Sequence, residues 1–226
     1  MKRWLPPALL AASLSAVYLR TLAPGLTWMH DGADGGDLIT AAATGGVPHP
    51  SGYPLYTLLA GAFQRLPVGS LAYRTNLLSA LCAVLAALLV YALVARSSDE
   101  TGTPGGWLAG SVSAYSIGLA PLLWSQAVIT EVYTLQAALV ALALFLSAAP
   151  PARIPPRPLD YARGLVLGLG AGGHLTTLLL TPLLLVNAMR RGDREERGAP
   201  GRPPMDRRSM LRQGAGLIAG LCIYLV

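Results

Sequence analysis

Long apolar runs separated by short polar stretches dominate this chain of 226 residues. The clearest runs occupy residues 4–19, 77–95, 107–124 and 127–146. Apolar runs of about 20 residues with few charges are typical of transmembrane helices. We therefore expect an all-α, polytopic membrane protein. The basic start, Met1-Lys2-Arg3, favours an N-terminus in the cytoplasm.

The next apolar run, Leu165–Val186, has two interpretations. As a single span it would place the arginine-rich residues 190–212 outside the cell, although basic loops tend to stay in the cytoplasm. As a hairpin turning at Gly170–His174, it returns that loop to the cytoplasm. Each arm of about 11 to 15 residues is then short for a hydrocarbon core of about 30 Å. We expect the hairpin, since a short one is tolerated where its tip lines a water-filled cavity.

These assignments predict one transmembrane domain over residues 1–226, with an outer loop at 24–72 and a cytoplasmic basic loop at 190–212. The last run, Gly214–Val226, carries no polar stop signal. We therefore expect the sequence to be the N-terminal part of a longer protein.

Composition supports the membrane class, because 53% of residues are hydrophobic, only 12% are charged and the mean hydropathy is +0.50. The net charge of +6 does not indicate nucleic-acid binding, since eight of the 17 basic residues lie within 190–212. Cys82 and Cys222 both lie in apolar runs, and we expect small buried packing residues rather than a disulfide or a metal site.

Three carboxylates, Asp31, Asp34 and Asp37, crowd the start of the outer loop. The spacing of Asp34 and Asp37 is that of a capping box, which predicts a short helix ending at Gly45-Gly46. Capping alone would explain two of these acids without any chemistry. It leaves Asp31 unexplained.

Histidines accompany the acids, with His30 next to Asp31 and His49 twelve residues after Asp37. His49 opens the stretch His-Pro-Ser-Gly-Tyr-Pro-Leu-Tyr, residues 49–56, whose prolines restrict the backbone. A stiff, acidic, histidine-bearing loop beside a membrane indicates an active site.

An amphipathic helix is predicted from Pro54 to Leu66. Its apolar positions are Leu55, Leu58, Leu59, Ala62, Phe63 and Leu66. Gln64 and Arg65 would then face away, and the helix would lie on the membrane surface.

Further polar side chains should reach the same outer end. Arg74 is either an anchor at the membrane surface or a clamp for a lipid phosphate. Glu131, one turn into the span 127–146, either makes a structural hydrogen bond or serves function, because carboxylates are costly in a membrane. His174, at the hairpin tip, is either a packing residue or part of the site.

Several of these segments resemble one transmembrane family, long catalogued as of unknown function, that includes animal protein O-mannosyltransferases. Ala33–Ala42 resembles its Gly-Asp-Ser-Gly-Glu-Leu-x-x-Ala-Ala segment, and His49–Leu55 resembles its His-Pro-Pro-Gly-Tyr-Pro-Leu segment. Arg74–Ala80, Trp124–Tyr133 and the glycine-rich run before His174 are similar in kind. Aspartate at 37 replaces the usual glutamate, glycine at 35 replaces serine and serine at 51 replaces proline.

The resemblance implies a GT-C type glycosyltransferase, with inverting chemistry, that moves a mannose-like sugar from a polyprenyl-phosphate donor outside the cytoplasm. It makes Asp34 and Asp37 the catalytic candidates, since the family carries its catalytic acid in the loop after the first span. We expect a protein or glycan hydroxyl as acceptor, membrane lipids as partners, no nucleic acid, and a bacterial plasma membrane as location.

The residue types fit this chemistry, because transfer to a hydroxyl needs a carboxylate base and groups that hold the departing phosphate. We assign Asp34 as the base, with Asp37 orienting the acceptor or helping as base. The expected substrate-binding residues are His49, Tyr53, Arg74, Glu131 and His174, with Arg74 and His174 on the phosphate.

Other interpretations remain open. The acids could instead hold a divalent cation through oxygen ligands, but no Asp-x-Asp occurs in this loop, and we expect no metal and no cofactor. A transporter could use Glu131 and His174 as a proton relay, although no internal repeat is visible. A non-catalytic membrane scaffold or a truncated paralogue is the third possibility.

Overall fold

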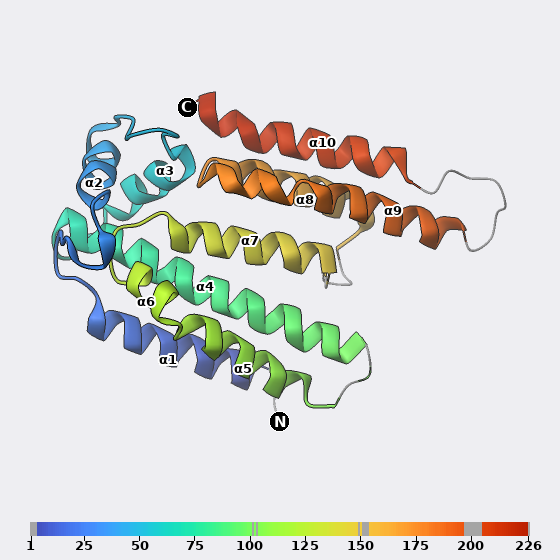
Figure 1. Ribbon diagram of the computed structural model, residues 1–226, viewed down its shortest axis with the longest axis horizontal. Coiled ribbons are helices and arrows are strands. Elements are labelled where there is room, and N and C mark those ends of the chain that lie inside the picture. Colours follow the sequence, from blue (N-terminus) through green and yellow to red (C-terminus); the bar gives the residue numbers. More distant parts are fainter. Residues whose placement is uncertain are drawn as a thin grey trace.

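The structure is a computed structural model that describes residues 4–100, 102, 104–148, 150, 154–196 and 205–225. The described residues form helices and no strand, which confirms the all-α prediction. The longer helices are α1 (Leu5–Thr21), α4 (Leu71–Glu100), α5 (Gly106–Gly118), α7 (Tyr133–Ala148), α8 (Pro156–Ala171), α9 (Pro182–Glu196) and α10 (Arg207–Leu221). Figure 1 shows them side by side along the long axis, with the short helices α2 (Gly35–Thr44) and α3 (Pro54–Phe63) gathered at one end.

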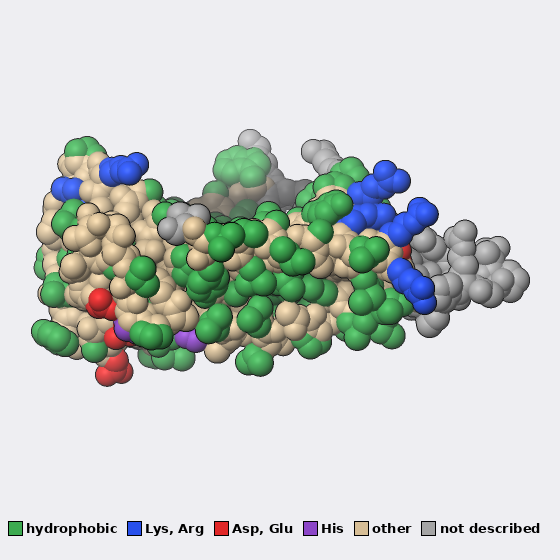
Figure 2. All heavy atoms as spheres, turned by 90° about the horizontal axis from the view of Figure 1, so that it is seen from above, with side chains coloured by type: hydrophobic (Ala, Val, Ile, Leu, Met, Phe, Trp, Pro, Cys, Tyr) green, Lys and Arg blue, Asp and Glu red, His purple; other side chains and the backbone are tan. Residues whose placement is uncertain are grey.

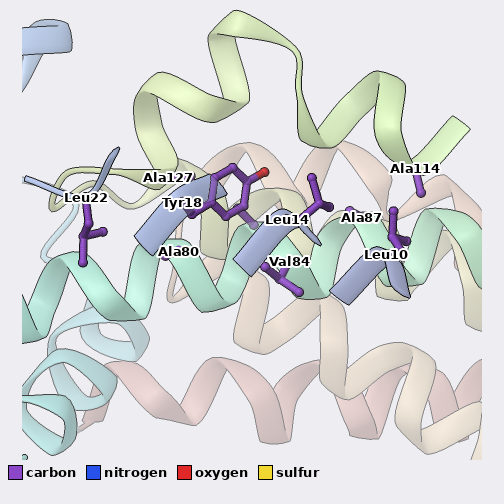
Figure 3. Packing of buried hydrophobic residues seen from close by; sticks show 10 residues of the cluster. Leu10, Leu14, Tyr18, Leu22, Ala80, Val84, Ala87, Ala114 and Ala127 are labelled. Carbon is purple, nitrogen blue, oxygen red and sulfur yellow. The ribbon is translucent and has the colours of Figure 1, made fainter. Parts of the chain in front are cut away.

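The first core cluster joins α1 to α4 and α5 through one buried stripe. Leu10, Leu14 and Tyr18 recur every four residues on α1 and are almost fully buried. They pack with mostly small side chains, which are Ala83 of α4 and, as labelled in Figure 3, Ala80, Val84 and Ala87 of α4 and Ala114 of α5. Small residues let helix backbones approach closely. The Tyr18 hydroxyl also donates to the carbonyl of Gly118 at 2.6 Å, where α5 ends.

The run at 107–124, predicted as one span, forms two helices with a sharp bend between them. Helix α5 ends at Gly118, and α6 (Pro121–Ala127) starts at an angle of 65° to it. Pro121 cannot donate a backbone hydrogen bond and forces Ala120 into an extended conformation. The break lies near the end of the bundle that carries α2 and α3 (Figure 1).

The fourth run starts later than predicted. Helix α7 begins only at Tyr133, so residues 128–132 form an irregular segment and Glu131 lies outside the helix. The interpretation of Glu131 as a residue one turn inside a span is therefore wrong.

The hairpin prediction for the fifth run is confirmed. Helix α8 ends at Ala171, the chain turns at Gly172–His174, and the 3-10 turn η2 (Leu175–Leu180) leads into α9, which runs back along α8 (Figure 1). At the turn, the Leu55 backbone N–H of α3 donates to the Gly172 carbonyl at 3.0 Å. The tip thus lies against the predicted outer loop.

Helices α8 and α10 make the closest packing. Gly164 and Gly168 of α8 face Gly216 and Gly220 of α10, and a Cβ at any of them would overlap backbone atoms of the other helix. At the far end of this contact, the fully buried Asp160 accepts a hydrogen bond from Arg212 at 3.1 Å. Helix α10 begins at Arg207, capped by the Asp206 side chain. The predicted basic loop at 190–212 is thus helical at both ends, and 197–204 lie outside the described residues.

Both short helices of the outer loop are present as predicted, but their details differ. Asp34 is the residue before α2, yet its side chain makes no capping hydrogen bond, so the capping box is absent. On α3 the most buried side chains are Tyr56 and Ala60, while Leu58 is 48% exposed. Gln64 points inward rather than away, and its amide donates to the Ile39 carbonyl at 3.0 Å.

Few of the described helices are candidates for membrane spans. Among the described residues, α4 is long and apolar enough to cross a membrane, and α5 with α6 qualifies only if the bent pair is one span. The polytopic GT-C bundle therefore stays a prediction. Figure 2 shows hydrophobic side chains spread along the face drawn, between the two ends of the bundle.

Cys82 is buried as expected, whereas Cys222 is exposed, contrary to expectation.

Candidate functional site

Two carboxylates open helix α2 and face the same side. Asp34 and Asp37 are three residues apart, a spacing that places side chains one above the other on a helix. Their side chains are about half exposed, at 46% and 47%. Figure 2 shows acidic and histidine side chains gathered at this end of the molecule, opposite a group of basic side chains. The pair is open to a substrate from outside.

His49 connects the two carboxylates. Its Nδ1 lies 2.8 Å from Asp37 Oδ2, and its backbone N–H donates to the same oxygen at 2.9 Å. Its Nε2 lies 3.5 Å from Asp34 Oδ2. The backbone and ring hydrogen bonds from His49 lower the pKa of Asp37 below its ordinary value. Asp37 is therefore firmly held by His49, through both its backbone and its ring.

Beyond His49, the site consists of a row of aromatic rings. The Tyr53 ring packs edge-on to His49 with centroids 5.2 Å apart, and it lies 6.2 Å from the His174 ring. On the other side of His174, the Tyr133 ring lies 6.0 Å away. Tyr53 has φ +43°, a left-handed conformation that is unusual outside glycine. The loop, the start of α7 and the hairpin tip thus meet in one row of rings.

His174 is oriented by the turn that follows it. Its Nδ1 lies 2.8 Å from Thr176 Oγ1 and accepts the Thr176 backbone N–H at 3.3 Å. A ring nitrogen that accepts must be unprotonated in the neutral imidazole, so the proton is on Nε2. His174 therefore presents an N–H donor from the hairpin tip.

Glu131 reaches the site because polar groups on α4 hold the irregular segment before α7. The Ser79 hydroxyl donates to the Glu131 carbonyl at 3.3 Å and accepts its backbone N–H at 3.4 Å. One residue earlier, the Thr130 hydroxyl donates to Asn76 Oδ1 at 2.6 Å. Further back, the Ala23 N–H donates to the Val128 carbonyl at 2.9 Å.

The Glu131 side chain is 2% exposed, and its Oε2 has no hydrogen-bond partner among the described residues. Burial, and next the negative charge of Asp34, raise the pKa of Glu131 from an ordinary 4.5 to about 7. A buried carboxyl with a proton affinity near neutrality is the kind of group found in functional sites.

Arg74 does not join this group. Its Nε donates to the Val68 carbonyl at 2.7 Å, and its two terminal nitrogens donate to the carbonyls of Gln64 at 2.6 Å and Gly69 at 3.0 Å. All three nitrogens thus hold the loop between α3 and α4. These contacts describe a loop clamp rather than a free phosphate ligand.

The structure therefore brings together six of the seven predicted site residues: Asp34, Asp37, His49, Tyr53, Glu131 and His174. The seventh, Arg74, closes a loop instead. Sequence reasoning missed Tyr133, although it stands in the segment Trp124–Tyr133 that carried part of the family resemblance. Within the described part of the chain, no three His, Cys, Asp or Glu side chains form a group that could hold a metal ion.

A carboxylate pair joined by an imidazole can accept a proton from a hydroxyl, and exposed rings beside it can bind a small polar molecule. Such a site suits a group-transfer enzyme. The comparison with known families agrees, because the chain belongs to the family described as the N-terminal domain of protein O-mannosyl-transferase TMEM260, which matches residues 34–197.

Two curated relatives carry the same name. The chain is 42% identical over 137 residues to protein O-mannosyl-transferase TMEM260 of Mus musculus. The aligned residues make up 60% of this chain and 18% of the relative. It is 30% identical over 141 residues to the Dictyostelium discoideum protein of that name, covering 61% of this chain and 16% of the relative. The chain spans less than a fifth of either relative. Both relatives are eukaryotic and give no support to a bacterial plasma membrane. No solved structure matches the chain.

Proposed function

We propose that this chain forms the catalytic start of a membrane mannosyltransferase, which transfers mannose from a polyprenyl-phosphate donor to a hydroxyl of a protein. Family membership and the names of the two relatives support the sugar and the protein acceptor. The lipid donor follows from the apolar character of the chain and from the GT-C resemblance. The single observation that carries the proposal is the position of His49 between Asp34 and Asp37.

The reaction needs one base that takes the proton from the acceptor hydroxyl. Asp34 Oδ2 has only a long contact, 3.5 Å, to His49 and is half exposed, so it can reach an incoming hydroxyl. The acceptor oxygen attacks the anomeric carbon, the bond from that carbon to the phosphate oxygen breaks, and Asp34 takes the hydroxyl proton. Polyprenyl phosphate leaves with the bonding electron pair. One such displacement inverts the anomeric centre.

Asp37 and His49 position this base. Asp37 fixes the His49 ring through Nδ1, and Nε2 then faces Asp34. The Nε2–H of His174 is a donor available to the departing phosphate, whose charge grows as the bond breaks. Arg74 supports the loop that leads into α4, since each of its three nitrogens donates to a carbonyl of that loop.

A transfer assay on the full-length protein tests the proposal, with radiolabelled mannosyl-phosphoryl polyprenol as donor and secreted protein domains as acceptors. Asp34→Asn should lower transfer by about two to four orders of magnitude, the usual contribution of a general base. Asp31→Asn is the matched control, since Asp31 is an exposed carboxylate in the same loop, and it should keep normal transfer. If Asp34→Asn also retains full turnover, the acid is structural. If the wild-type protein transfers no mannose, a scaffold role is favoured.

A further inference from the structure

The row of rings beside the carboxylates ends in a side chain that the described residues leave half exposed. Tyr133 is the first residue of α7, and it is 49% exposed. Its ring leads through His174 and Tyr53 to His49, with centroid separations between 5.2 and 6.2 Å. Three separate segments contribute these rings, so the row is a product of the tertiary fold. An accessible aromatic surface therefore runs directly into the catalytic pair.

A buried carboxyl precedes this row in the chain. Glu131 is two residues before Tyr133 and is 98% buried, and its Oε2 accepts no hydrogen bond from the residues that the structure describes. The segment that carries Glu131 packs against the start of α2, since a Cβ at Gly35 would lie 3.5 Å from the Thr130 carbonyl oxygen. Buried polar atoms without a partner are rare and costly, so a group from outside the chain is the natural partner.

We propose that Tyr133, His174 and Tyr53, with the carboxyl of Glu131, form the subsite for the hexose ring of the donor. A hexose offers exposed C–H groups on a ring face, which pack on aromatic surfaces, and hydroxyls around its rim, which need hydrogen-bond partners. A ring surface with a few placed polar groups is the usual composition of a site for a small molecule. This inference rests on the proposed function.

The arrangement of the rings and the carboxylates separates binding of the sugar from the chemical step. His49 touches the row through Tyr53 and faces both carboxylates through its nitrogens, so it marks the boundary between sugar and acceptor. A hexose on the row has its anomeric carbon toward Asp34. Glu131 then binds a hydroxyl of the sugar and takes no part in the chemistry, which makes it a binding residue and not the base.

A lipid-binding experiment on the full-length protein in lipid nanodiscs tests the subsite. The probes are mannosyl-phosphoryl polyprenol and the same polyprenyl phosphate without sugar, and the measured quantity is the ratio of their dissociation constants. Tyr133→Ala should reduce the preference for the sugar-bearing lipid by about fivefold to tenfold, the size of one aromatic contact. Tyr133→Phe should keep the preference, because the ring remains.

The matched control is Tyr161→Ala, since Tyr161 is 48% exposed but lies on α8, near the buried Asp160 and away from the hairpin tip. It should change neither dissociation constant. Glu131→Leu, which keeps the size but removes the polar group, should lower the preference by about tenfold or more, and Glu131→Gln should restore part of it. Binding of the sugar-free lipid should be unchanged in every variant.

The outcomes separate the two proposals. If the wild-type protein transfers mannose but Tyr133→Ala and Glu131→Leu keep the full preference, the subsite is overturned and the mannosyltransferase stands. If the wild-type protein binds the two lipids equally while transferring mannose, the subsite is overturned as well. If it prefers the sugar-bearing lipid through Tyr133 but transfers nothing, the subsite is supported and the catalytic proposal fails.

Discussion

Asp37 holds His49 through one oxygen, which accepts the His49 backbone N–H at 2.9 Å and lies 2.8 Å from its Nδ1. This double contact fixes the loop that carries His49 against the first turn of α2. Such a carboxylate orients an imidazole and keeps its proton on the nitrogen that faces it. We therefore propose that Asp37 acts through His49 and not directly on a substrate.

Asp37→Asn should accordingly lower mannose transfer by about 10- to 100-fold, the usual cost of losing an orienting partner. That is less than the loss expected for Asp34→Asn. The measurement is kcat and KM of both variants beside the wild type. Equal losses in the Asp34 and Asp37 variants would show that both carboxylates act as bases.

Glu131 should make the stability of the protein depend on pH. Its folded pKa of about 7 lies above the ordinary value of 4.5, so the folded state keeps a proton that the unfolded state loses between these two values. The contribution of Glu131 to stability should therefore be greatest in mild acid and fall as pH rises from about 4.5 to 7. Thermal unfolding of the wild type and Glu131→Gln at pH 5 and pH 8 measures this. The variant should lose this part of the dependence, and an unchanged difference between the two pH values would contradict it.

The contact between α8 and α10 should not tolerate a methyl group. A Cβ at Gly216 would lie 3.0 Å from the Leu165 backbone nitrogen and would overlap the Tyr161 carbonyl. Gly216→Ala should destabilise the protein by about 1 to 3 kcal/mol, as overpacking commonly does. A Cβ at Gly214, two residues away on the same helix, would meet no atom within 4 Å. Gly214→Ala should be neutral or stabilise by up to about 1 kcal/mol. Thermal unfolding in detergent compares the two.

The predicted topology places residues 24–72 outside and 190–212 in the cytoplasm. Single cysteines at two exposed positions, Ala43 on α2 and Arg208 on α10, test this in a protein whose Cys82 and Cys222 have been replaced. An impermeant thiol reagent applied to intact cells should label the cysteine at 43 and not the one at 208. Labelling of both or of neither would refute the orientation.

Local sequence signals were sufficient for the elements that depend on neighbours in the chain. Pro54 and the glycines after Thr44 set the bounds of α2 and α3, because proline and glycine act on their own backbone. The hairpin followed from Gly172 and from the charge of the arginine-rich segment. The error at Asp34 has the same origin, since the spacing of a capping box is local but the competing partner, His49, is fifteen residues away.

The sequence alone determined an all-helical chain, the reversal at Gly172–His174, and a family whose acids lie in the first loop. Only the tertiary structure decided how the polar residues are used. Glu131 lies before the start of α7, and its backbone is hydrogen-bonded to Ser79, 52 residues earlier in the chain. Arg74 donates to the carbonyls of the loop between α3 and α4, and the Tyr133 ring packs near His174, 41 residues later in the chain. Apolar periodicity reports which face a residue takes on its own helix, whereas hydrogen-bond partners are chosen by the packing of distant segments.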